Sequence, residues 1–167
     1  MRTDVDKTTK EFLTPSQRWA ELIIVAAMLL LFGFFVYQQI AHTGFFTAKF
    51  GSLEMFCLYG PILFSLAAPL SRASSGRRNP ARRFEVATHL FLAIGSLWLW
   101  IAFPFNFAHL ADVLPGAIRF VLVWITNDIG KAVLILQVIV GLISAFLTTV
   151  KYLSVRRQEP PRLRGYG

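Results

Sequence analysis

The chain has 167 residues, of which 55% are hydrophobic and 16% are charged, and its net charge is +8. An ordinary soluble domain carries about 25% charged residues, and a chain this short cannot bury four long charge-free runs in a soluble core. Its single cysteine, Cys57, excludes an intrachain disulfide and a cysteine metal cluster.

The first predicted span follows a polar tail, residues 1–18. Thr14 and Pro15 are typical of a helix start, with Thr14 as the N-cap and Pro15 at the first helical position. No residue from 22 to 48 is charged, and a helix that rises 1.5 Å per residue crosses about 30 Å of hydrocarbon within such a run. We therefore expect a first span over about residues 19–40. The acidic residues before it and its length argue against a cleaved signal peptide.

The second predicted span, about residues 54–71, is short and contains Pro61 and Pro69. Proline removes a backbone donor and bends a helix, which membrane helices tolerate where neighbours cover the gap. The preceding Gly60 is a small residue that permits close helix packing. The sequence therefore predicts a bent second span.

The third predicted span covers about residues 86–105. Trp98 and Trp100 lie toward its far end and are typical of an aromatic anchor at a membrane interface. Pro104 predicts the end or a kink of this helix.

The stretch between the third and fourth spans contains an apolar run, residues 117–127, that is too short to cross a membrane. We interpret it as a short interfacial helix, with a new helix start near Asn127 because residues 126–128 are cap-type residues. The alternative is an extension of the fourth span, which we expect over about residues 129–152, before a basic tail at residues 154–167. The transmembrane domain then covers residues 19–153.

The distribution of basic residues predicts the orientation. With four spans, the N-terminal tail, the loop between spans two and three, and the C-terminal tail share one side, and they hold 14 of the 17 lysines and arginines. Short segments rich in lysine and arginine stay in the cytoplasm, so both termini are expected there. The residues of the central loop that determine this topology are Arg72, Arg77, Arg78, Arg82 and Arg83.

Four polar residues are candidates for function. Asp128 and Lys131 are three apart, so on a helix they share a face and can pair, as an interfacial ion pair or as charges at the outer mouth of an ion path. Gln137 and His89 are the most interior polar side chains of the spans. A hydrogen bond between helices is the expected role of each.

Catalytic, metal and cofactor sites have little support in the sequence. There is no glycine-rich phosphate loop, and no Ser-His-Asp set or carboxylate pair falls at one membrane depth. Glu21, Glu54 and Glu85 each lie at a predicted span end, where a carboxylate is solvated or stabilises a helix N-terminus. Only His42 and His109 share a side, and both fall near turns, which disfavours haem and zinc. We therefore expect no enzyme activity and no cofactor.

The expected fold is an all-α integral membrane protein, a bundle of four transmembrane helices with both termini cytoplasmic, in a cell or inner membrane. The leading functional hypothesis is a non-enzymatic subunit or scaffold that packs with itself or with another membrane protein. The alternative is a small channel or transporter, and a third class is a haem-binding electron carrier. The expected partners are anionic lipid headgroups on the inner side and a membrane protein, and not nucleic acid, because the cations flank the apolar runs.

Overall fold

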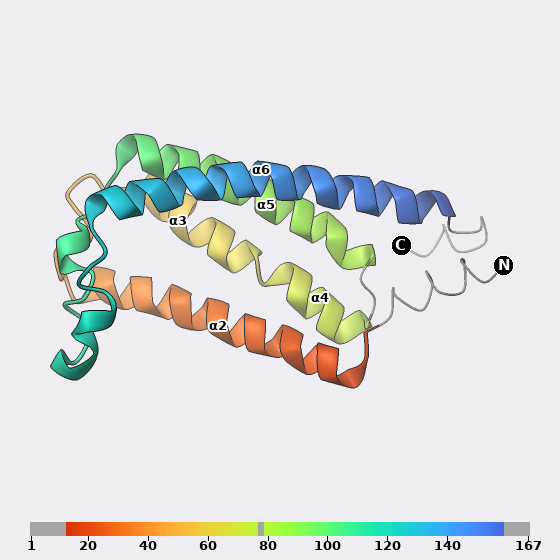
Figure 1. Cartoon of the computed structure of the whole chain (residues 1–167), viewed down its shortest axis with the longest axis horizontal. Coiled ribbons are helices and arrows are strands. Elements are labelled where there is room, and N and C mark those ends of the chain that lie inside the picture. Colours follow the sequence, from red (N-terminus) through yellow and green to blue (C-terminus); the bar gives the residue numbers. More distant parts are fainter. Residues whose placement is uncertain (1–12, 77–78, 159–167) are drawn as a thin grey trace.

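The computed structural model describes residues 13–76 and 79–158, and the secondary structure in this part of the chain is helical apart from one isolated bridge between Phe46 and Phe105. The predicted all-α fold is confirmed. The helices, in chain order, are α2 (Pro15–Ile40), α3 (Ser52–Phe64), α4 (Ala67–Ser75), α5 (Asn79–Ala102), the 3-10 helices η1 (Phe107–His109) and η2 (Gly116–Val121), and α6 (Asn127–Gln158) (Figure 1).

Four helical segments are long and apolar enough to cross a membrane, which indicates a multi-pass membrane protein. Their number and order agree with the prediction, and their ends differ by a few residues. The third differs most, because α5 starts well before residue 86 and ends at Ala102, ahead of Pro104. The segments are Pro15–Ile40, Ser52–Ser75, Ala81–Ala102 and Asn127–Ser154.

Local sequence explains where α2 begins. Thr14 is its N-cap and Pro15 lies in its first turn, as predicted. The Thr14 hydroxyl accepts from the Gln17 backbone at 3.4 Å, and the Gln17 side chain accepts from the Thr14 backbone at 3.1 Å. This reciprocal capping box satisfies two backbone donors that no intrahelical carbonyl can reach.

The predicted break before the fourth span is confirmed. α6 begins at Asn127, so the alternative that it extends back through residues 117–127 is wrong. The preceding segment is not a regular α-helix. It consists of η2 followed by turns, residues 122–124.

The predicted bend of the second span is also confirmed. The span consists of two helices, since α3 ends at Phe64 and α4 begins at Ala67. The break lies at Ser65 because Pro69, four residues later, has no N–H for the Ser65 carbonyl and its ring crowds that carbonyl. The Ser65 hydroxyl donates to the Ile62 carbonyl at 2.6 Å and so satisfies an acceptor at the break. Hydroxyl side chains of this kind satisfy backbone carbonyls that a break in a membrane helix leaves unpaired.

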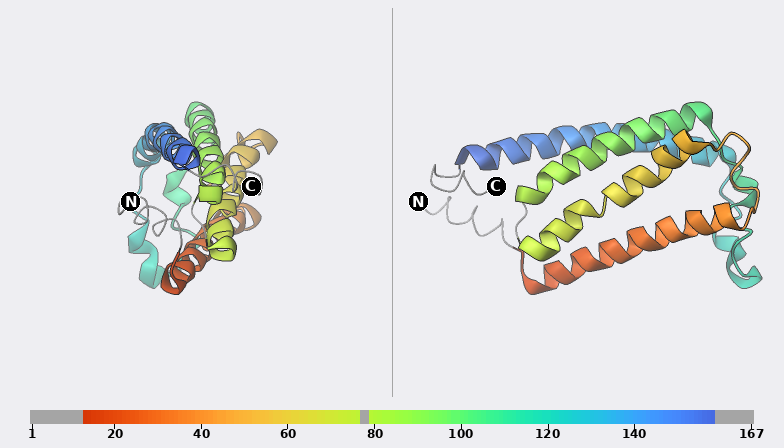
Figure 2. Two further views of the ribbon diagram at one scale, coloured as in Figure 1. Left: turned by 90° about the vertical axis from the view of Figure 1, so that its right-hand side faces the viewer. Right: turned by 180° about the vertical axis from the view of Figure 1, so that it is seen from behind.

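Helix α5 is at the centre of the packing. It lies against α6, α3 and α4, whereas α2 packs on α3 and α4 (Figures 1 and 2). Two glycines allow close backbone approach. A Cβ at Gly95 would lie 2.7 Å from the Cys57 carbonyl oxygen, and one at Gly141 would lie 2.9 Å from the His89 carbonyl oxygen. Small residues at such crossings are typical of membrane helix packing.

The two ends of the bundle differ in chemistry. We call one the arginine end: it holds the start of α2, the connection between α4 and α5, and the last turns of α6 (Figure 1). The other is the aromatic end, which holds the connections from α2 to α3 and from α5 to α6. At the arginine end Gly76 caps α4 with φ +66°, where a Cβ would collide with the Arg18 guanidinium.

Candidate functional site

The aromatic end is closed by a cluster of rings around Phe45, which is 1% exposed. Phe45 lies in the connection from α2 to α3, and its ring packs against rings from α2 and from the segment after α5. The backbones of the two connections also pair, since Asn106 N–H donates to the Phe45 carbonyl at 2.7 Å. The rings within 6 Å of Phe45, centre to centre, are those of Phe35, Phe46, Phe105 and Phe107.

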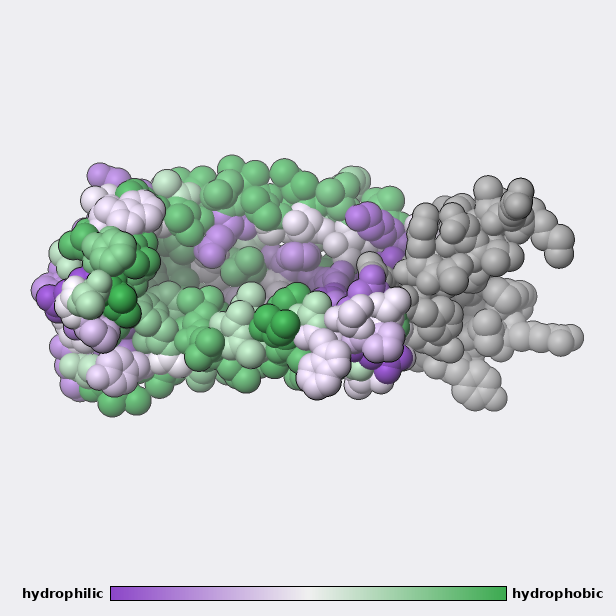
Figure 3. Space-filling view, turned by 60° about the horizontal axis from the view of Figure 1, so that its bottom comes forward, coloured by the Kyte–Doolittle hydropathy of each residue, from purple (hydrophilic) through white to green (hydrophobic). Residues whose placement is uncertain are grey.

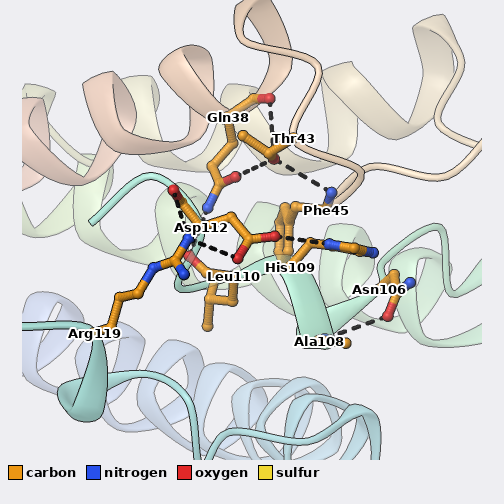
Figure 4. A network of polar contacts seen from close by, with 9 residues as sticks. All are labelled: Gln38, Thr43, Phe45, Asn106, Ala108, His109, Leu110, Asp112 and Arg119. Atoms are coloured by element: carbon orange, nitrogen blue, oxygen red, sulfur yellow. Dashed lines mark hydrogen bonds and ion pairs between the residues drawn. The ribbon is translucent and has the colours of Figure 1, made fainter. Parts of the chain in front are cut away.

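A buried amide joins the end of α2 to this cluster. Gln38 is 1% exposed, and its Nε2 donates to the Leu110 carbonyl at 2.8 Å (Figure 4). Its Oε1 accepts from the Thr43 hydroxyl, so both polar atoms of the amide have partners. A buried polar group is tolerated when it is satisfied in this way, and here it fixes the α5–α6 connection against α2.

A charged network lies in the same connection. Asp112 Oδ2 is 2.8 Å from His109 Nδ1, and Asp112 Oδ1 is 3.1 Å from Arg119 Nη2 (Figure 4). Arg119 Nη2 also donates to the Asp112 carbonyl at 3.3 Å. Arg119 belongs to η2, so these bonds tie η2 back to the turn after η1. All three side chains are well exposed, so these ion pairs contribute little to the free energy of unfolding. Their effect is to orient η2 against the turn after η1.

Beyond this network is a short apolar surface, residues 116–124, which we call the aromatic-end lobe. It lies at the edge of the bundle beside the end of α2 (Figures 1 and 2). Phe120 and Val123 are each 70% exposed and Trp124 is 62% exposed, and Ile118 and Val121 are exposed as well. Side chains of the spans such as Leu30 are equally exposed, but these five belong to a segment outside the spans, where a partner or the membrane interface would cover them.

Asp128 and Lys131 do not pair with each other among the residues that the structure describes. The Lys131 ammonium instead lies 4.9 Å from the centre of the Phe103 ring, a cation–π contact. Asp128 lies in the first turn of α6, where a carboxylate is stabilised by the helix dipole. The first turn of α6 is fixed at its start by Asn127, whose Oδ1 accepts from the Phe107 backbone at 2.8 Å.

The two interior polar candidates differ. The predicted bond between helices is confirmed for Gln137, whose Oε1 accepts from the Ser96 hydroxyl of α5 at 3.0 Å. His89 is half-buried on α5, and its side chain has no hydrogen-bond partner within the described part of the chain. Its predicted bond between helices is therefore not observed.

At the arginine end, one guanidinium joins three helices. Arg72, in the last turn of α4, lies 2.8 Å from Glu21 of α2 and also contacts Glu85 of α5. The exposed fractions of the three side chains are 16%, 14% and 27%, and Arg72 Nε is buried with no hydrogen-bond partner among the described residues. A desolvated ion pair of this kind holds its members firmly in place, since removing one leaves a charge without compensation.

These ion pairs line a cavity of about 340 Å³ between α2 and α6. Figure 3 shows a hollow along this face, with hydrophobic rims and hydrophilic residues in its floor. α2 does not pack on α6 as it does on α4, so the cavity is open between these two helices. The cavity is lined by Gln17, Ala20, Glu21, Arg72, Arg82, Glu85, Thr148 and Lys151.

The five arginines of the central loop between spans two and three were predicted only to set the topology, and the structure gives some of them further contacts. Arg82 lines the cavity, whereas Arg83 is exposed and lies 5.1 Å from the centre of the Phe84 ring. Arg77 and Arg78 lie outside the described residues, as do most of the predicted tails.

Two of the three glutamates at predicted span ends lie in a different environment from the one expected. Glu21 and Glu85 were expected to be solvated or to stabilise helix ends, but both are largely buried against Arg72 because three helices converge on that side chain. Glu54 does stabilise a helix start, since it accepts from the Gly51 backbone and from Trp98 Nε1, each at 3.0 Å.

Within the described ranges, no three His, Cys, Asp or Glu side chains lie close enough together to hold a metal ion. Comparison of the chain with protein-family models, with curated proteins and with solved structures found no match. The argument for function therefore depends on the geometry of the aromatic-end lobe and of the cavity at the arginine end.

Proposed function

We propose that this protein is a non-enzymatic membrane subunit that packs, through the aromatic-end lobe, with a second copy of itself or with another membrane protein. The observation that carries the proposal is the exposure of the lobe: Phe120, Val123 and Trp124 are each more than 60% exposed. Aromatic side chains of this kind are the usual anchors of protein interfaces.

The attachment of the lobe supports this role. Arg119 and Asp112 tie η2 to the turn after η1, and Gln38 ties that turn to α2. The apolar side chains are therefore presented by a segment that is held in place before binding. A preorganised surface loses less conformational entropy when a partner binds, which raises affinity.

We further propose that the arginine end is cytoplasmic and that the lobe lies on the opposite face, as a short interfacial segment in a cell or inner membrane. The support is the positive-inside rule, since 14 of the 17 basic residues belong to segments at the arginine end. On this orientation the lobe meets partners at the outer face of the membrane.

The test is native mass spectrometry of the full-length protein purified in a mild detergent. It measures the mass of the assembly and identifies any protein that copurifies in a fixed ratio. We expect an assembly larger than one chain. The double variant Phe120→Ser/Trp124→Ser should lower the assembled fraction at least several-fold. The matched control is Trp19→Ser/Phe146→Ser, because these two aromatic side chains are 69% and 68% exposed but belong to α2 and α6, away from the lobe.

Two results would contradict the proposal. One is a wild-type protein that is a single chain with no stoichiometric partner. The other is ion flux through liposomes that contain this protein alone and that is lost in Asp128→Asn, which would favour the channel hypothesis.

A further inference from the structure

We infer that the cavity at the arginine end is a binding site for the phosphate of an anionic phospholipid, whose acyl chains lie at the opening of the hollow between α2 and α6. This inference does not depend on the proposed contact surface, which is at the other end of the molecule. It follows from the charge of the cavity, its depth along the spans and its opening toward lipid.

The charge of the cavity suits a phosphodiester. Its lining carries three cations, Arg72, Arg82 and Lys151, and two carboxylates, Glu21 and Glu85, so its net charge is +1. A phosphodiester carries one negative charge and balances the cavity. Arg72 already contacts both carboxylates, and Lys151 makes no ion pair within the described part of the chain. Lys151 is therefore the cation best placed to donate to a phosphate oxygen, as lysine does in phosphate sites.

The lining also has neutral donors. Gln17 and Thr148 face the same cavity from α2 and α6. An amide and a hydroxyl donate to the remaining oxygens of a phosphate or of a glycerol headgroup. Side chains from four helices thus converge on one volume of about 340 Å³, which is large enough for a headgroup.

The depth of the cavity matches the level of phospholipid headgroups. The charge-free run of α2 starts at Leu22, directly after Glu21. From there to Ile40, at 1.5 Å per residue, α2 spans roughly the 30 Å of the hydrocarbon core. Glu21 therefore lies at the boundary of the hydrocarbon, next to the layer that holds lipid phosphates.

The opening of the cavity distinguishes a lipid from a soluble phosphate. The hollow that contains the cavity continues along the bundle between hydrophobic rims (Figure 3). The acyl chains contact these rims at the opening of the hollow, away from its hydrophilic floor, while the headgroup stays in the polar cavity. Basic pockets between membrane helices recognise anionic lipid headgroups by this combination of charge and apolar walls.

The test is a lipid titration of the full chain in mild detergent, followed by native mass spectrometry. We expect one phosphatidylglycerol to bind at least five-fold more tightly than phosphatidylcholine, because only the former carries a net negative charge. Lys151→Gln should weaken phosphatidylglycerol binding about tenfold, the effect of losing one charge-assisted hydrogen bond. Thr148→Val should weaken it less.

The matched control is Arg83→Gln. It removes the same charge from the same end of the molecule, but Arg83 does not line the cavity. We expect phosphatidylglycerol binding by this variant to equal that of the wild type, and circular dichroism checks that all variants are folded.

Three outcomes would overturn the inference. The first is an equal loss of binding in Lys151→Gln and Arg83→Gln, which would indicate general attraction to a basic surface. The second is unchanged binding in both Lys151→Gln and Thr148→Val. The third is displacement of the lipid by inorganic phosphate at comparable concentration, which would assign the cavity to a soluble anion.

Discussion

The aromatic end and the arginine end of this bundle hold the same helices together by different means. At the aromatic end, rings from three segments pack around Phe45 and leave it 1% exposed. At the arginine end, Arg72 bridges Glu21 and Glu85, and a cavity remains beside them. The packed rings around Phe45 leave no space for a ligand, whereas the ion pairs of Arg72 border a cavity that can hold one.

Each end contains packed residues that hold the helices together and other residues that we propose to bind a partner or a lipid. The ring cluster is structural, and the exposed apolar lobe is attached to it from outside through Asp112 and Arg119. The charge network is structural too, while Lys151 faces the cavity without an ion pair in the described part of the chain. At both ends a packed core thus presents exposed groups that are not part of that core.

The largest expected effect comes from breaking the aromatic end. Phe45→Ala removes a fully buried ring and should lower the free energy of unfolding by about 3–4 kcal/mol. The measurement is loss of helical circular dichroism during titration with a denaturing detergent. Phe120→Ala is the control, because Phe120 is 70% exposed, and it should change stability by less than about 0.5 kcal/mol. Equal losses of stability in Phe45→Ala and Phe120→Ala would show that the ring cluster does not hold this end together.

The next effect tests the arginine end. Arg72→Leu removes the guanidinium that contacts both Glu21 and Glu85, and leaves Arg82 and Lys151 as the cations of the cavity. It should lower the free energy of unfolding by about 2–3 kcal/mol in the same titration. Replacing both carboxylates as well, with Glu21→Gln and Glu85→Gln, should restore about half of the loss, because no buried charge then remains. A stable Arg72→Leu variant, or a triple variant no better than the single one, would show that this network does not hold the three helices.

A smaller effect is expected where α5 packs between its neighbours. Gly95→Ala places a Cβ against the Cys57 carbonyl and should lower the free energy of unfolding by about 1–2 kcal/mol. Gly33→Ala is the matched control, since nothing lies within 4 Å of its Cβ position, and this variant should be neutral or more stable by up to about 1 kcal/mol. The opposite order of stabilities would mean that α3 and α5 are farther apart than described.

The smallest effect concerns the middle of the bundle. Gln137→Leu removes the hydrogen bond from Ser96 and should lower the free energy of unfolding by about 0.6 kcal/mol. In a double-mutant cycle with Ser96→Ala, the coupling energy should be of the same size. Strictly additive effects of the two substitutions would show that the bond contributes nothing.

Much of the fold is predictable from the sequence because membrane spans have strong local signals. Charge-free runs define four helices, Pro69 explains the break in the second, and cap-type residues place the start of α6 at Asn127. Gln137 was also recognised, since a lone polar residue within a span needs a partner on another helix.

The charge network and the cavity were not predicted, because they depend on how three helices converge. Glu21 lies 51 residues before Arg72, and Glu85 lies 13 residues after it on the next span, so each alone resembles an ordinary charge at a span end. A signal was present, since Glu21, Arg72 and Glu85 each lie at the end of a predicted span on the side that holds most of the basic residues. The same limit applies to Lys131, whose ring partner Phe103 lies on a different segment.

The central claim is that the two ends lie on opposite sides of a membrane, with the arginine end inside. The direct measurement is labelling of single cysteines in intact cells with a membrane-impermeant thiol reagent, in a Cys57→Ser background. Ser74 and Ala48 are both exposed, at the arginine end and the aromatic end respectively. The account predicts that Ala48→Cys is labelled in intact cells and that Ser74→Cys is labelled only after the membrane is opened. Labelling of both from outside, or of Ser74→Cys alone, would contradict it.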